Sequence, residues 1–248
     1  MRVRSRRDFL ALGGGALAAL AGWKWLESRS RIGDVPFPLR RTLELNERLA
    51  ARYFNDDRQA PTFARALARE PRVNGTEGLS DDFDPREWRL LATSARARRT
   101  ITLQEIRALP RFEMTTDLKC IEGWSVVVHW AGARLRDFAA AYGLGTRDGS
   151  VPDIGRRPRD VLKYVSLATP DGAYYVGLDV ASAMHPQTLL CYEMNGAPLT
   201  LPHGAPLRLV TTVKYGIKSI KRVGAIAFTD ARPRDYWAEH GYDWYAGL

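Results

Sequence analysis

The sequence contains little cysteine and little histidine. Only two cysteines, Cys120 and Cys191, and four histidines occur among its 248 residues. Two cysteines are too few for a disulfide framework. The zinc motif His-Glu-x-x-His and the haem attachment motif Cys-x-x-Cys-His are both absent from the sequence. These absences argue against a zinc hydrolase, a cysteine hydrolase with a paired histidine, and a chain that carries its own haem.

A basic helix interleaved with aromatic residues is also missing. The formal net charge is +9, but residues 1–31 carry seven Lys/Arg against two acids, so only +4 remains for the rest. Because much of the basicity belongs to the N-terminal segment, we predict no nucleic-acid partner. The hydrophobic fraction of 45% and the charged fraction of 26% are ordinary for a soluble globular domain.

The N-terminus is typical of an export leader. Arg6 and Arg7 precede Asp-Phe-Leu, and an apolar stretch rich in Gly and Ala runs over residues 10–26, interrupted by Lys24. A basic segment before such a stretch predicts a secretory signal, and the paired arginines favour the twin-arginine route to the periplasm. We predict this leader over residues 1–31. An uncleaved anchoring helix is the alternative, because the stretch has about the minimum spanning length and no Ala-x-Ala site follows.

The remaining sequence predicts an α+β fold in a single domain. We expect a linker over residues 33–41, helices over 42–53 and 62–70, and an irregular stretch over 71–85. Short strands dominate afterwards, at residues 88–92, 112–119, 125–130, 164–168, 174–178, 188–194, 207–213 and 223–229, with helices near 102–110 and 135–142. Strands mixed with short helices, without regular βαβ alternation, indicate this class. The predicted division is a helical and irregular segment over 32–84 and the main domain over 85–248.

Three local signals place turns and caps. Thr102, followed three residues later by Glu105, predicts a capping box at a helix start. The turn sequences Pro170-Asp171-Gly172 and Asn195-Gly196 each lie between predicted strands and predict hairpins.

Cys120 lies between a predicted strand and a turn that contains Gly123. Loops at strand ends commonly carry functional residues. A thiolate suits a soft or high-valent metal, an exposed loop cysteine can equally be a nucleophile, and a buried inert cysteine is the third reading. Spacing alone leaves these open. Cys191 lies in an apolar run and is predicted to be core. A disulfide between Cys120 and Cys191 is an alternative in an oxidising compartment, and it would exclude a metal on Cys120.

Several segments carry a family resemblance. They read Cys-Ile-Glu-Gly-Trp-Ser from Cys120, Ala-Met-His-Pro from Ala183 with Thr-Leu-Leu from Thr188, Gly-Ala-Pro-Leu-Arg-Leu-Val from Gly204, and Lys-Tyr-Gly-Ile-Lys-Ser-Ile-Lys from Lys214. Together they resemble the molybdopterin-binding domain of the sulfite oxidase superfamily. More narrowly, they are similar to the catalytic subunits of bacterial periplasmic methionine sulfoxide reductases. The match covers roughly residues 85–245 and implies a sulfite-oxidase-type fold with a molybdenum–molybdopterin cofactor.

The resemblance also implies roles for individual residues. Cys120 corresponds to the protein's ligand to molybdenum, beside the sulfurs of the pterin dithiolene. The other expected cofactor contacts are Thr169, basic Arg208 and Lys221 at the phosphate end, backbone amides at Ser219 and Ile220, His203 where this branch often has Asn, and Asn55 near the metal.

The implied activity is transfer of an oxygen atom at sulfur. The family suggests reduction of methionine sulfoxide in proteins, or of a related small S-oxide, with electrons from a membrane haem b subunit. Sulfite-oxidising members follow the ligand cysteine with Ala-Gly-Asn-Arg, whereas this chain has a carboxylate, Glu122, which would repel sulfite. The chain stops at Leu248 without an immunoglobulin-like dimerisation domain, so a monomer is expected. Sulfite dehydrogenase-like oxidation and a cofactor-free exported binding module are the alternatives.

Structural roles remain open for several of these side chains. Arg208 can pair with a carboxylate in the core. Lys214, Lys218 and Lys221 can form a solvated basic face. His185 is expected to shape a turn before Pro186, and His129 and His240 have no partner at metal-ligand spacing.

Overall fold

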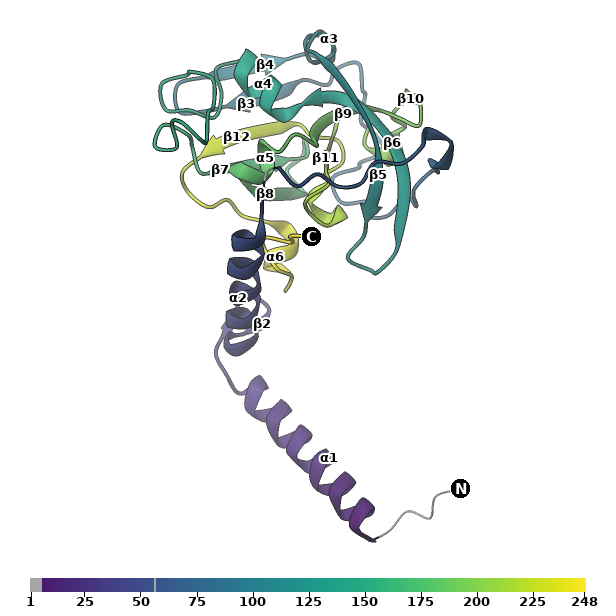
Figure 1. The fold of residues 1–248 in the computed structure, drawn as a ribbon, viewed down its shortest axis with the longest axis vertical. Helices are drawn as coiled ribbons and strands as arrows, with labels where there is room; N and C mark the ends of the chain where they lie inside the picture. Colours follow the sequence, from purple (N-terminus) through teal and green to yellow (C-terminus); the bar gives the residue numbers. More distant parts are fainter. Residues whose placement is uncertain (1–5, 56) are drawn as a thin grey trace.

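A first five-stranded antiparallel sheet carries the middle of the chain. In the computed structural model, which describes residues 6–55 and 57–248, its order is β10-β9-β6-β5, with β11 also pairing β9 (Figure 1). Its strands are β5 (Arg111–Lys119), β6 (Ser125–Arg134), β9 (Thr188–Met194), β10 (Ala197–Pro198) and β11 (Arg208–Thr211). β5 and β6 form one long hairpin whose nine residue pairs run from Arg111–Ala133 to Lys119–Ser125. This hairpin holds the Cys120 turn.

A second sheet combines strands that are far apart in the sequence. Its order is β4-β3-β12-β7-β8, and only β12 and β3 run parallel. The strands are β3 (Leu90–Thr93), β4 (Arg98–Ile101), β7 (Tyr164–Ala168), β8 (Tyr175–Asp179) and β12 (Ala225–Thr229). The β7–β8 hairpin closes at the predicted Pro-Asp-Gly turn. The Asn195-Gly196 turn instead leads from β9 into the short β10, and β11 follows only after the 3-10 turn η2 (Leu201–His203).

The main core joins the two sheets. Buried Leu167 and Ile226 of the second sheet belong to the same apolar cluster as Leu190 and Leu209 of the first. Burial of such a side chain stabilises the fold by about 1.5–3 kcal/mol. Two short helices, α3 (Leu103–Arg107) and α4 (Leu135–Ala141), add apolar residues to this cluster. The mixed architecture confirms the predicted α+β single domain, and α3 begins with the predicted capping box.

The predicted helix over residues 62–70 is wrong. Only a 3-10 turn, η1 (Arg65–Leu67), forms there. The segment crosses the β5–β6 hairpin (Figure 1), and its main chain binds the strands: Phe63 N–H donates to the Thr115 carbonyl at 2.9 Å and Arg69 N–H to the Val127 carbonyl at 2.8 Å. These tertiary hydrogen bonds override the helix propensity of an alanine-rich stretch.

Two helices precede the sheets. α1 (Arg6–Glu27) contains no buried residue, projects from the body in Figure 1, and is long and apolar enough to cross a membrane, a test that a signal sequence also passes. Residues 1–5 of the predicted leader lie outside the described residues. The predicted linker over 33–41 is wrong, because β2 (Val35–Pro36), which pairs with β1 (Arg31–Ile32), and the start of α2 (Phe37–Tyr53) lie in this range. Proline is tolerated in the first turn of α2, since that turn has no intrahelical acceptor for its N–H groups.

Candidate active site

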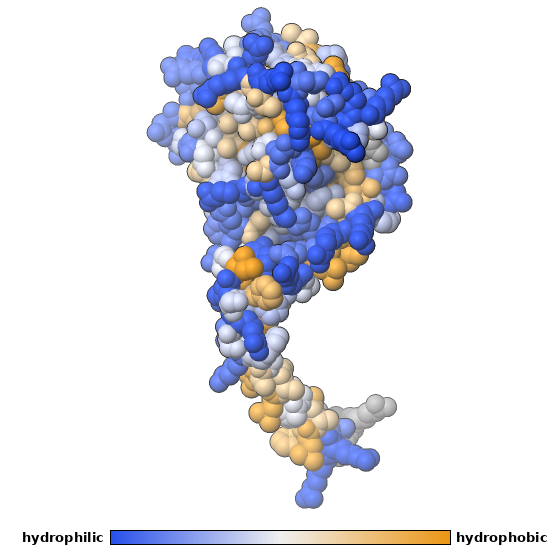
Figure 2. All heavy atoms as spheres, turned by 90° about the vertical axis from the view of Figure 1, so that its left-hand side faces the viewer, coloured by the Kyte–Doolittle hydropathy of each residue, from blue (hydrophilic) through white to orange (hydrophobic). Residues whose placement is uncertain are grey.

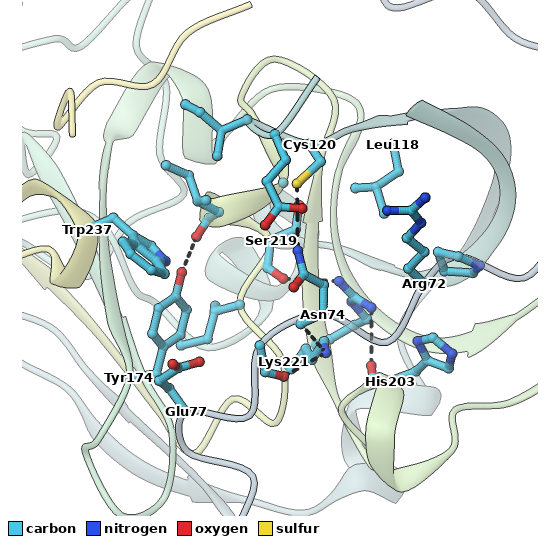
Figure 3. A pocket seen from close by; sticks show the side chains of 18 of the residues that line it. Arg72, Asn74, Glu77, Leu118, Cys120, Tyr174, His203, Ser219, Lys221 and Trp237 are labelled. Carbon is cyan, nitrogen blue, oxygen red and sulfur yellow. Dashed lines mark hydrogen bonds between the residues drawn. The ribbon is translucent and has the colours of Figure 1, made fainter. Parts of the chain in front are cut away.

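Cys120 lies in the turn that joins β5 to β6. Its N–H donates to the Trp124 carbonyl at 2.9 Å, and Gly123 N–H donates to the Cys120 carbonyl at 3.1 Å, which fixes a tight turn. The thiol is half-buried and lines a cavity of about 270 Å³ (Figure 3). Six of the residues expected from the sequence line this cavity: Cys120, His203, Arg208, Ser219, Ile220 and Lys221.

Arg208 supplies a buried positive charge to the cavity. Its guanidinium donates to the carbonyls of His203 at 3.2 Å and Ser219 at 3.1 Å, while Nε has no partner among the described residues. Burial lowers the pKa of Arg208 to about 10. The alternative that Arg208 pairs with a carboxylate is wrong, because no such ion pair occurs in the described part of the chain. A buried cation held by carbonyls and by the Trp130 ring, 5.0 Å from its centroid, leaves a positive charge for an anion to neutralise.

Lys221 is the second cation. Its ammonium donates to the carbonyls of Asn74 at 2.7 Å and Gly75 at 3.2 Å. Desolvation and the nearby charge of Arg208 lower the pKa of Lys221 to about 8. Gly204, with φ +94°, permits this approach, because a Cβ there would lie 2.7 Å from the Lys221 Cβ. Two cations with few countercharges suit a phosphate, which guanidinium and ammonium groups bind well.

This electrostatic arrangement gives a pH-dependent stability difference. The folded-state pKa of Lys221 lies below its unfolded value of about 10.4. Between pH 8 and that value the unfolded chain holds a proton that the folded chain has released, so stability rises with pH. We therefore expect cofactor-free Lys221→Met to be more stable than the wild type at pH 7, with the difference shrinking towards pH 10. Urea unfolding at both pH values measures it, and a difference independent of pH would contradict the prediction.

The other two lysines of this segment are structural. Lys214 is buried, with Nζ 3.1 Å from the Asp179 carboxylate. Lys218 is fully buried and donates to the Gly177 carbonyl and to the Asp235 carboxylate. The alternative of a solvated basic face is therefore wrong. Instead, Lys214 and Lys218 connect the Lys214–Lys221 segment to β8 and to the C-terminal region.

The backbone near Ser219 differs from the expected anion nest. Ser219 N–H donates to the Gly216 carbonyl at 2.9 Å and closes the 3-10 turn η3 (Gly216–Lys218), and its hydroxyl accepts from Thr211 N–H at 3.3 Å. Among the described residues, the N–H groups of Ile220 and Lys221 have no such acceptor. They are therefore the amides available to an anion.

His203 is buried at the end of η2. Its Nε2 lies 3.2 Å from the Glu70 carboxylate. Burial is the main cause that lowers the pKa of His203, so the ring is neutral at pH 7 and keeps one donor and one acceptor. A neutral ring can still hydrogen-bond a pterin edge as an asparagine would.

Two expected site residues lie elsewhere. Thr169 is buried and does not line the cavity. Its hydroxyl bonds Asp171 at 2.6 Å and accepts from Tyr174 N–H at 3.1 Å, which closes the β7–β8 hairpin. A Cβ on Gly78 would lie 2.4 Å from the Thr169 side chain, so Thr169 packs closely against the residue that follows Glu77 of the cavity lining. Asn55 is exposed after α2, accepts from Asp57 N–H at 2.9 Å and does not line the cavity that contains Cys120.

Asn74, and not Asn55, is the asparagine that lies beside Cys120. Its side-chain nitrogen lies 3.9 Å from Cys120 Sγ, and Figure 3 shows the amide pointing towards the thiol. The same side chain hydrogen-bonds Glu122, and together with the Trp124 indole it holds the pKa of that carboxyl below its usual range. The Asn74-Gly75 turn dipeptide is the signal that could have identified this residue.

Three aromatic residues of the cavity were missed entirely. Tyr174 immediately precedes β8, and its hydroxyl donates to the Ile217 carbonyl. Trp237 of α6 (Tyr236–Glu239) and Tyr242 come from the C-terminal region. These three residues lie far from Cys120 in the sequence, so no motif spacing could have linked them to the site.

The remaining candidate residues are structural. Cys191 is fully buried in the core as predicted, and burial raises its pKa to about 12. Both cysteines are free, so the disulfide alternative is wrong. His185 is buried, and its Nδ1 accepts from Gln187 N–H at 3.2 Å, in agreement with a turn-shaping role. Among the described residues no group of three His, Cys, Asp or Glu side chains could hold a metal ion.

Comparisons with known proteins agree with this site. The oxidoreductase molybdopterin binding domain model matches residues 77–237. The chain is 29% identical to the protein-methionine-sulfoxide reductase catalytic subunit MsrP of Campylobacter jejuni, over 99% of this chain and 81% of the relative. It is 33% identical to that of Xanthomonas campestris over 58% of this chain, and 30% identical to that of Ralstonia nicotianae over 66%. The chain spans only about half the length of these last two, 46% and 51%.

One solved structure supports the fold. The sulfane dehydrogenase SoxCD from Paracoccus pantotrophus matches 61% of this chain and 40% of its own, with a TM-score of 0.51 and 17% identity. An identity this low informs the fold alone. The family model covers well over half of the chain and includes Cys120, Arg208 and Lys221. This chain therefore belongs to the oxidoreductase molybdopterin-binding domain family of the sulfite oxidase superfamily.

Proposed function

We propose that this chain is a molybdenum-dependent oxidoreductase that reduces S-oxides, with protein methionine sulfoxide as the favoured substrate. The observation that carries the proposal is the convergence of one half-buried thiol and two cations on a single cavity. A soft thiolate suits molybdenum, and Arg208 and Lys221 suit the phosphate of a pterin. The unpaired Nε of buried Arg208 supports this fit.

Each part of the cofactor has matching residues. Cys120 would hold the metal, and Arg208 and Lys221, with the amides of Ile220 and Lys221, would hold the phosphate. His203 and Asn74 would offer polar atoms to the pterin and the metal end. When bound, the cofactor supplies two-electron chemistry that moves an oxygen atom to or from sulfur.

The residues at the metal end favour a neutral substrate. Glu122 is fully ionised at neutral pH, because Trp124 N–H donates to it at 3.0 Å and Asn74 also binds it. This charge, two residues from Cys120, repels sulfite but not a sulfoxide. Trp124, Trp237 and Tyr242 line the cavity, and aromatic rings contact sulfur groups favourably. Reduction of a sulfoxide consumes two electrons and two protons and yields a thioether and water.

The electrons must reach the cavity from another protein. The sequence carries no haem motif, and we propose a membrane haem b subunit as the donor. The names of the relatives, which describe catalytic subunits, support a second subunit. We also propose that the leader directs the folded chain to the periplasm through its paired arginines, and that the enzyme is a monomer.

The test is metal content and turnover on the full chain, expressed with its leader in a host that makes the cofactor. We expect stoichiometric molybdenum and reduction of methionine sulfoxide with an artificial electron donor, with little oxidation of sulfite in a parallel assay. Turnover of sulfite alone would replace the reductase assignment by sulfite dehydrogenase-like oxidation. Folded chain without molybdenum would support the cofactor-free binding module instead.

A further inference from the structure

The α2 helix covers the domain with only one side. Glu47 binds Arg232 at 2.7 Å, Arg40 donates to the Ala238 carbonyl at 2.9 Å, and Ala50 packs against the cluster that contains Trp244. These contacts define the inner side of α2. They leave the opposite side of the helix exposed, with one contact among the described residues: the Arg58 guanidinium lies over the Tyr53 ring, 4.4 Å from its centroid.

The outer face of α2 consists of Leu45, Leu49, Tyr53, Arg48 and Arg52. The first three follow one another at helical spacing and are 48%, 54% and 69% exposed. Arg48 and Arg52 are exposed beside them, at the same four-residue spacing. No ion pair is found for either arginine within the described residues, whereas Glu44 and Glu47 are paired with Arg41 and Arg232.

Leucine, tyrosine and arginine on one helix face fit a particular surface. Interfacial helices bury leucine and aromatic side chains at the level of the lipid headgroups, while arginine binds anionic lipid. Figure 2 shows apolar side chains over the helices beneath the body, among basic and polar ones. A protein partner would also bury apolar groups, but unpaired arginines beside them favour a surface of dense negative charge.

The position of the face in the chain supports the same surface. Only residues 28–36 separate α2 from α1, the helix that is long and apolar enough to cross a membrane. Extended residues span at most about 3.6 Å each, and the β1–β2 pairing shortens this connection further. Whenever α1 is inserted in a bilayer, the N-terminal end of α2 is therefore held near the lipid surface, within reach of its outer face.

We propose that the outer face of α2 is a docking site for an anionic lipid bilayer. The face holds the domain against the membrane independently of the activity proposed above. The affinity of this face alone for lipid is modest. Two arginines contribute about 1 kcal/mol each near an anionic surface, and the bilayer would bury its apolar side chains only in part. Binding is therefore expected at millimolar lipid and is strongest when α1 tethers the chain.

The experiment is co-sedimentation of residues 28–248 with vesicles of phosphatidylglycerol and phosphatidylcholine, against vesicles of phosphatidylcholine alone. Removal of α1 leaves the domain intact, since α1 contributes no buried residue. We expect binding only to the anionic vesicles, decreasing with salt. Arg48→Glu with Arg52→Glu is expected to weaken the apparent Kd at least about 30-fold, given about 1 kcal/mol per arginine and 1.4 kcal/mol per tenfold.

The matched control is Arg98→Glu with Arg99→Glu, which changes the net charge equally on exposed residues of β4. This control should bind vesicles like the parent. If both double variants lose vesicle binding equally, the binding depends on overall charge and not on α2, and the proposal is overturned. Absence of vesicle binding would overturn it too. If the chain instead forms a dimer that Leu49→Glu disperses, the face belongs to a second copy and not to lipid.

Discussion

Replacement of Cys120 by serine is expected to lower sulfoxide reduction by more than about 100-fold. Even residues that only orient metal ligands cost about 10–100-fold when replaced, and Cys120 is the thiol that faces the cavity. A serine hydroxyl is a hard, protonated group at neutral pH and does not replace a soft thiolate. Turnover per chain and molybdenum content of wild type and variant, purified in parallel, measure the effect.

The second cysteine supplies the matched control for this prediction. Cys191→Ala removes a thiol that is buried in the core, away from the cavity lining. It should keep the metal and the turnover, with only a small loss of stability from the missing sulfur. Wild-type turnover in Cys120→Ser would contradict the role proposed for the Cys120 thiol. Parallel loss in both variants would point to a general folding defect.

Lys218→Met is expected to destabilise the fold by about 3–5 kcal/mol. It removes the partner of Asp235, which is only 2% exposed, and leaves a buried carboxylate without its countercharge. For a chain of this size the loss corresponds to a decrease in Tm of roughly 6–20 °C. Thermal unfolding followed by circular dichroism measures it.

The double variant Lys218→Met with Asp235→Asn separates charge from packing. It removes both charges, so it should recover part of the lost stability. Arg157→Met, which breaks the exposed pairs with Asp148 and Asp160, is the surface control and should hardly change Tm. If Lys218→Met unfolds at the same temperature as this control, the buried pair contributes nothing to stability.

Local patterns in the sequence predicted much of the fold. Turn residues located the β7–β8 hairpin, and β-rich segments located the two strands that pair as the β5–β6 hairpin. The parallel pairing of β3 with β12 joins Leu91 to Ala225 and has no local signal. The helix expected over 62–70 failed for the same reason, since its main chain is committed to strands that follow much later in the sequence.

The site shows the same division. Cys120, Arg208 and Lys221 were identified because they lie in recognisable segments, and the structure brings them to one cavity. Asn55 was named and Asn74 was not identified, because an irregular polar stretch gives no register for alignment. Only contacts through space, such as the one between Asn74 and Cys120, distinguish the two.

The cavity walls also imply an order of events in biogenesis. The residues that line the cavity come from separate parts of the chain. They include Asn74, Cys120, Lys221 and Tyr242. A ribosome must release the chain from Asn74 to Tyr242 before these walls can meet. A cofactor that fills this cavity would therefore meet its complete set of walls only after residues up to Tyr242 have been synthesised and folded. A cellular check on cofactor content would therefore also be a check that the domain has folded.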